Sequence, residues 1–125
     1  MIAGKKILII SAHAADYVWR SGGTIAHYVK GGADVNVVCL SYGIRGESND
    51  LWKKGGQTYE SVKTIRKGET LKAAEILGIK DKIEFWDLQD YCMELTPAVY
   101  DRLVAKIREV RPDIIISHDK YDILN

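Results

Sequence analysis

The segment from Ile7 to Thr24, ILIISAHAADYVWRSGGT, constrains the fold more than any other part of the chain. Its apolar start predicts a buried strand, and the glycine pair at 22 and 23 predicts entry into a helix. In open α/β sheets, the turn after a parallel strand lies at the carboxyl edge, where ligands bind. His13 and Asp16 occupy the predicted turn, and they are therefore candidate functional residues.

Strand-like and helix-like segments alternate along the rest of the chain. Alternation of this kind predicts an α/β fold, a Rossmann-like open parallel sheet with helices on both faces. We expect strands at 6–11, 35–41, 82–86 and 113–117, and helices at 22–31, 58–77 and 96–111. The helical periodicity predicts inward-facing side chains at Ile25, Ala26 and Val29 in the first helix and at Val99, Leu103, Ile107 and Val110 in the last.

The composition limits the kind of protein. With 125 residues, 46% of them hydrophobic, residues 1–125 are expected to form a single small domain. A net charge of +1 without a basic cluster argues against a nucleic-acid partner. No apolar run has the length of a membrane span or a signal peptide. Cys39 and Cys92 lack metal or redox spacing, and we expect both to be core or near-core thiols of a cytoplasmic protein.

Two segments depart from the alternation. The stretch from Tyr42 to Gln57 contains four glycines and predicts a long loop that acts as a lid or binding loop. It carries Arg45 and Glu47. The chain stops a few residues after the last expected strand, and we expect it to be the N-terminal portion of a longer domain.

A histidine and an aspartate three residues apart on one turn can point at a single cation, because both are ligands that zinc accepts. From the residues alone, His13 could also be a structural histidine whose side chain hydrogen-bonds to the backbone of the turn. A phosphate-binding turn is disfavoured, because neither G-x-G-x-x-G nor a P-loop lysine is present.

These residues resemble the PIG-L/LmbE-like family of metal-dependent deacetylases. The family pattern is a strand, then A-H-P-D-D-E, then G-G-T-I-A, and the chain has AHAADY at 12–17 and GGTIA at 22–26. The similarity continues through VVCLSYG at 37–43, Arg66 and Glu69, residues 85–90 and the R-P-D at 111–113.

The resemblance implies a zinc site. His13 and Asp16 correspond to two of the family's three metal ligands. The third is a histidine that the pattern places just beyond residue 125, so the 125 residues are expected to lack the full set. His118 corresponds to a position that lines the site, where it is expected to bind substrate.

The chain also departs from the pattern. Ala15 stands where the deacetylases have the aspartate that serves as general base, and Tyr17 stands at the following glutamate. A methyl group cannot accept a proton. With Ala15, Tyr17 and the segment from Tyr42 to Lys53, the chain resembles the hydratase branch of the family. Enzymes of that branch add water to a carbon–carbon double bond of 4-oxalomesaconate or its enol form. The alternatives are a zinc-dependent N-deacetylase with a different base and an inactive fragment.

A tricarboxylic substrate needs cations and a proton carrier. Arg45 on the long loop, with its planar fork, is the expected carboxylate-binding residue, and Arg20 is a further candidate. Glu47 is the expected catalytic residue, although spacing alone also allows a solvated Arg45 and Glu47 ion pair. The expected partner is a small-molecule carboxylate, and a homo-oligomer is left open. Further candidates for pocket walls or supporting partners are Trp19, Trp52, Asp119 and Asp122.

Overall fold

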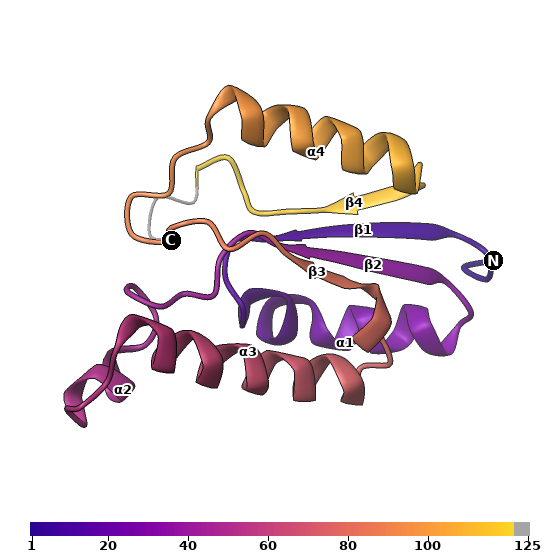
Figure 1. Cartoon of the computed structure of the whole chain (residues 1–125). Coiled ribbons are helices and arrows are strands. Elements are labelled where there is room, and N and C mark those ends of the chain that lie inside the picture. The colour runs from indigo at the N-terminus through magenta and orange to yellow at the C-terminus, as the bar shows by residue number, and fades with distance from the viewer. Residues whose placement is uncertain (122–125) are drawn as a thin grey trace.

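Four parallel strands form one sheet in a computed structural model that describes residues 1–121 (Figure 1). The order across the sheet is β3 (Ile83–Phe85), β2 (Asp34–Cys39), β1 (Lys6–Ser11) and β4 (Ile114–Ile116). In the register, Ile7 of β1 lies opposite Val35 of β2 on one side and Ile114 of β4 on the other. The predicted open parallel sheet is confirmed.

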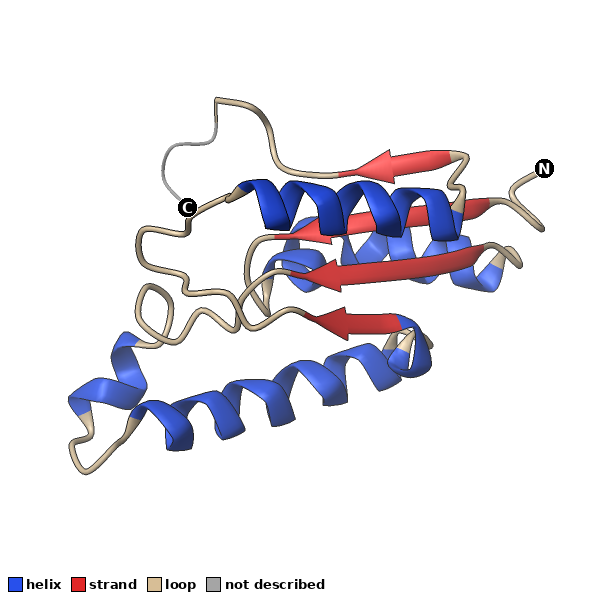
Figure 2. Cartoon of the chain, turned by 45° about the horizontal axis from the view of Figure 1, so that its top comes forward, coloured by secondary structure: helices blue, strands red, loops and turns tan. Residues whose placement is uncertain are grey.

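Helices cover both faces of the sheet, as predicted. Figure 1 shows α1 (Asp16–Lys30) and α3 (Tyr59–Ile76) on one face and α4 (Pro97–Val110) on the other. A short α2 (Asn49–Lys53) and a 3-10 turn (Lys80–Lys82) complete the elements of the described chain. Figure 2 shows the four strands pointing the same way, so their carboxyl ends share one edge. The loops that follow the strands gather at this edge.

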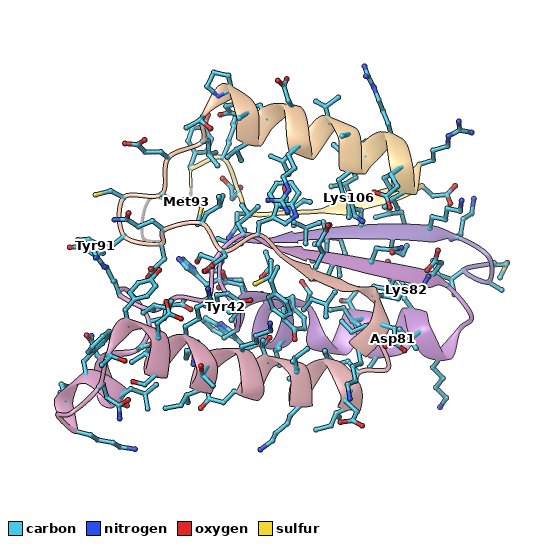
Figure 3. All side chains as sticks on the ribbon, viewed as in Figure 1. Tyr42, Asp81, Lys82, Tyr91, Met93 and Lys106 are labelled. Atoms are coloured by element: carbon cyan, nitrogen blue, oxygen red, sulfur yellow. The ribbon has the colours of Figure 1, made fainter. Side chains whose placement is uncertain are left out.

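Each face has its own core. Ile7 and Ile9 of β1 pack with Tyr17 and Ile25 of α1 on one face, whereas Leu8 packs toward α4 on the other. Successive residues of β1 are buried because the strand has a layer of helices above and below it. A third cluster joins the long loop to α3. Its members include Tyr42, which is labelled in Figure 3. The Tyr42 ring stacks on Phe85 with ring centroids 5.2 Å apart.

The first helix begins earlier than predicted. It starts at Asp16, and Gly22 and Gly23 lie inside it at positions where an added Cβ would meet no atom within 4 Å. A glycine is tolerated in a helix interior at a cost of about 1 kcal/mol, so the glycine pair did not mark the boundary. The turn is therefore short, and Asp16 belongs to the first turn of α1. Ala26, predicted to face inward, is exposed.

Other predictions also need correction. The segment from Tyr42 to Gln57 is interrupted by α2. Ile107 is 37% exposed, because α4 buries mainly Val99 and Val110. Cys39 is buried, and burial raises the pKa of its thiol to about 12, but Cys92 is exposed and is not a core thiol.

Two further points concern the limits of the chain. Asp122, a candidate supporting residue, lies outside the described residues. Within residues 1–121, no helix combines the length and the apolar character needed to cross a lipid bilayer.

Tyr17 ties the first turn of α1 to α3. Its ring is 1% exposed, and its hydroxyl donates to the carbonyl oxygen of Thr70 at 2.8 Å. The Thr70 hydroxyl in turn donates to the carbonyl oxygen of Ala14 at 2.8 Å. The residue that replaces the family's glutamate therefore fixes the turn after β1 against α3.

We expect Tyr17→Phe to lower the free energy of unfolding by about 1 kcal/mol, because it removes one buried hydrogen bond and keeps the ring. Urea denaturation measures the change. Tyr100→Phe is the matched control, since Tyr100 is 54% exposed. Equal stability of Tyr17→Phe and the wild type would show that the hydrogen bond from Tyr17 to Thr70 does not stabilise the fold.

Candidate metal centre

His13 and Asp16 converge in the turn between β1 and α1. The backbone N–H of His13 donates to Asp16 Oδ2 at 2.9 Å, and His13 Nδ1 lies 3.2 Å from the same oxygen. Both residues are buried, with exposed fractions of 5% and 2%. The carboxylate lies in the first turn of α1, where the helix dipole favours negative charge. The imidazole therefore has a carboxylate partner.

Glu47 joins this pair from the loop after β2. Its Oε1 lies 3.4 Å from His13 Nδ1, and its side chain is 27% exposed. One ligand atom from each of His13, Asp16 and Glu47 lies within 4.8 Å of the other two. One imidazole and two carboxylates thus share a small volume at the carboxyl edge of the sheet.

The electrostatics of the cluster follow from burial and from these contacts. Burial alone would lower the pKa of His13, but the hydrogen bond to Asp16 and the charge of Glu47 raise it above its ordinary value of 6.5. Burial would raise the pKa of Asp16, yet the hydrogen bonds from His13 lower it overall. For Glu47, burial dominates and raises the pKa. Burial therefore disfavours the ionised form of both carboxylates, and nearby positive charge favours it.

The cluster fits a divalent metal ion. Among the described residues, Asp16 Oδ1 and Glu47 Oε2 are buried oxygens that accept no hydrogen bond. Each oxygen has a guanidinium group nearby, because Arg20 Nε lies 3.4 Å from Asp16 Oδ1 and Arg66 lies 3.8 Å from Glu47 Oε2, but neither contact is a hydrogen bond. Buried anionic oxygens are costly without such partners, and a bound divalent ion would add a further one. Imidazole and carboxylate ligands suit Zn²⁺ and other borderline divalent ions.

His118 and Arg20 also lie close to the Asp16 carboxylate. His118 Nε2 accepts a hydrogen bond from the N–H of Ala12 at 3.0 Å and lies 3.5 Å from Asp16 Oδ2. Arg20 Nε lies 3.4 Å from Asp16 Oδ1. These side chains help to line a cavity of about 90 Å³, together with Ser11, Ser21, Ser117 and Asp119. Two of the three predicted substrate-binding residues thus border the cluster.

Arg45 and the tryptophans lie further out. Arg45 is exposed, and its backbone N–H donates to Asp90. Trp19 is 73% exposed and lines a second cavity of about 220 Å³ between α1 and α3, which also includes Ala15. Trp52 is half-buried, and its indole N–H donates to the carbonyl oxygen of Ile44 at 2.7 Å. The tryptophans are thus a cavity wall and a loop anchor.

Sequence reasoning missed two residues that contact the Glu47 loop. In Arg66 of α3, Nη2 lies 3.8 Å from Glu47 Oε2 and Nη1 lies 3.1 Å from Glu69 Oε2. Asp90 is buried and accepts hydrogen bonds from the backbone of Arg45 and Gly46. Asp90 follows the third strand, so the rule that identified His13 also applies to it.

Comparisons with known proteins give a consistent picture. The family model described as "PIG-L: GlcNAc-PI de-N-acetylase" matches residues 8–125. A 4-oxalmesaconate hydratase of Pseudomonas putida is 46% identical over 97% of this chain and 46% of its own length. A diacetylchitobiose deacetylase of Thermococcus kodakarensis is 32% identical over 94% of this chain and 42% of its own length.

Solved structures agree in fold. GalB, the 4-carboxy-2-hydroxymuconate hydratase of Pseudomonas putida, superposes with a TM-score of 0.87 at 44% identity, over 96% of this chain and 50% of its own. The N,N'-diacetylchitobiose deacetylase of Pyrococcus horikoshii gives 0.82 at 28% identity, over 95% of this chain and 43% of its own. The chain spans about half the length of these relatives.

We expect Glu47→Gln to lower the pKa of His13, because the Glu47 carboxylate is one of the charges that raise it. An NMR titration of the histidine ring in metal-free protein measures the pKa. Glu69→Gln is the control, since its carboxylate pairs with Arg66. An unchanged His13 pKa in Glu47→Gln would show that the two side chains are not neighbours in solution.

Proposed function

The chain belongs to the PIG-L family, and on that premise we propose that it is part of a zinc-dependent hydratase. The proposed substrate is 4-oxalomesaconate or a similar oxo-tricarboxylic acid. One observation carries the proposal: Ala15 replaces the carboxylate of the family pattern, while the Glu47 carboxylate stands beside His13 and Asp16. The 46% identity to a 4-oxalmesaconate hydratase supports it.

We assign His13 and Asp16 as zinc ligands. Their convergence and the buried Asp16 Oδ1 support the assignment. The family pattern supplies a further histidine ligand from a segment outside these 125 residues, and we retain that expectation as part of the proposal. A bound zinc ion would polarise the oxygens of the substrate and make water a better nucleophile.

Glu47 is the proposed proton carrier. Hydration forms a C–O bond at one carbon of the double bond and a C–H bond at the other, so one proton must move from water to carbon. Burial raises the pKa of Glu47, which brings the carboxyl closer to the range where it can both accept and release a proton. The methyl group of Ala15 cannot take this role.

The proposed substrate-binding residues lie around the cluster, and two of them, Arg20 and Arg45, are cations. Arg20 and His118 border the cavity beside Asp16, and Arg45 lies on the same loop as Glu47. Guanidinium groups suit this role because their planar fork matches the geometry of a carboxylate. A substrate with several carboxylates would meet a cation from each of two directions.

The second candidate is an N-deacetylase in which Glu47 serves as general base. The observation that favours it is the superposition on a solved deacetylase with a TM-score of 0.82. In this case Glu47 would take a proton from water as the amide carbonyl is attacked.

The intact protein, assayed with 4-oxalomesaconate and with an N-acetylated sugar, is expected to turn over only the first. Turnover of the sugar alone would overturn the hydratase assignment in favour of the deacetylase.

We expect Glu47→Gln to lower kcat by about 10²- to 10⁴-fold, the usual contribution of a positioned acid or base. Steady-state kinetics measure the loss, with Glu94→Gln, an exposed position, as the control. Wild-type kcat in Glu47→Gln would remove Glu47 from the mechanism.

Zinc binding is expected to depend on the two assigned ligands. We expect His13→Ala and Asp16→Asn to lower the zinc content of the intact protein after dialysis, measured by elemental mass spectrometry. His27→Ala is the control, because His27 is an exposed histidine of α1. Full zinc content in both ligand variants would refute the assignment. Chelation is expected to abolish activity, and added zinc to restore it.

A further inference from the structure

We propose that Asp90 is a positioning residue for Glu47. Its carboxylate holds the Glu47 loop, defined as residues 43–48, in the conformation that directs Glu47 toward His13. The inference rests on the proposed function, because it assigns Glu47 the role of proton carrier. Asp90 lies outside the metal cluster and contacts the loop through backbone hydrogen bonds.

Asp90 accepts hydrogen bonds from the backbone just before Glu47. Its Oδ2 accepts the N–H of Gly46 at 2.6 Å and that of Arg45 at 2.9 Å, and its Oδ1 lies 3.2 Å from the Arg45 nitrogen. The Asp90 residue is only 9% exposed. Hydrogen bonds from N–H groups to a carboxylate are stronger than neutral ones, more so away from water. The two residues preceding Glu47 are thus fixed by one buried anion.

The Glu47 loop is also closed on itself. The N–H of Glu47 donates to the carbonyl oxygen of Gly43 at 3.2 Å, and the Ser48 hydroxyl donates to the same oxygen at 2.8 Å. The loop is therefore a compact turn. Its internal hydrogen bonds fix its shape, whereas contacts with other segments fix its orientation relative to His13.

Asp90 lies close to the Glu47 loop because β3 and β2 are neighbours in the sheet and the segments that follow them run side by side. The segment after β3 continues beside the segment after β2, with the N–H of Leu88 donating to the carbonyl oxygen of Leu40 at 2.8 Å. Figures 1 and 2 show both segments at the carboxyl edge of the sheet. The anchor thus connects Glu47 to a strand that contributes no residue to the metal cluster.

Two glycines allow the close approach. Gly43 has a φ of +68°, and a Cβ at this position would lie 2.9 Å from Glu47 Oε2. At Gly46, an added Cβ would lie 3.3 Å from Asp90 Oδ2. The loop lacks side chains at the points where it meets the Glu47 carboxylate and the Asp90 carboxylate. Contacts this tight define one orientation of Glu47.

The first test measures the anchor without using activity. Hydrogen exchange of the Arg45 and Gly46 amides in the intact protein is expected to be at least about tenfold faster in Asp90→Ala, because both lose their acceptor. Asp90→Asn, which keeps one carbonyl oxygen, is expected to exchange at an intermediate rate. Asp87→Asn is the control, since Asp87 lies in the same segment but pairs with Lys63. Unchanged exchange in Asp90→Ala would overturn the proposal.

The second test measures positioning. Asp90→Ala is expected to lower kcat by up to about 10²-fold, the loss that a displacement of about 1 Å can cause. In a Glu47→Gln background, the same substitution is expected to lower kcat no further. A purely structural Asp90 would instead give independent losses that multiply, which would contradict the proposal, as would a wild-type kcat with fast amide exchange.

A second variant guards against loss of the fold. Asp90→Asn keeps one carbonyl oxygen at the loop, and it is expected to lower kcat less than Asp90→Ala does and to cause no further loss in Glu47→Gln. If the wild type turns over only an N-acetylated sugar, the proposed hydratase fails. The same cycle measured on that reaction still decides whether Asp90 acts through Glu47.

Discussion

The buried carboxylate of Asp16 is the constraint on which the site depends. An ionised aspartate that is 2% exposed is stable only with partners, and the turn between β1 and α1 provides them. The N–H of His13 and its imidazole contact one oxygen, and Arg20 approaches the other. The start of α1 adds its dipole. These partners also fix the position of the imidazole, so the interaction that stabilises the buried carboxylate also holds the two proposed zinc ligands side by side.

The turn between β1 and α1 differs from the family pattern at two positions next to Asp16. At positions 15 and 17, alanine and tyrosine stand in place of the acidic residues of the family pattern. Tyr17 turns inward and bonds to Thr70, which makes it part of the core between α1 and α3. Position 15 carries no carboxylate, but a carboxylate from the loop after β2, that of Glu47, lies 3.4 Å from His13 Nδ1. In the proposed mechanism, the proton would therefore be delivered from the loop after β2 and not from the turn after β1.

Much of this arrangement follows from sequence patterns with a physical basis. The strand at 6–11 agrees with β1, and Thr96 with Pro97 begins α4 as predicted, because capping and proline geometry are local. His13 and Asp16 were identifiable from their place after a buried strand. The start of α1 was not, since Gly22 and Gly23 lie inside the helix and a glycine is tolerated in a helix interior. The contacts of Glu47 with His13 and of Asp90 with Gly46 depend on which strands are neighbours and on loop conformation, and no local pattern encodes them.

The central claim is that His13 and Asp16 grip one metal ion at the carboxyl edge of the sheet. A crystal structure of the intact protein with zinc, with anomalous diffraction recorded on both sides of the zinc absorption edge, tests it most directly. We expect an anomalous peak at about 2.0–2.2 Å from a His13 ring nitrogen and from an Asp16 carboxylate oxygen. A fully loaded protein whose zinc peak lies elsewhere, with His13 and Asp16 bound only to each other, would contradict it.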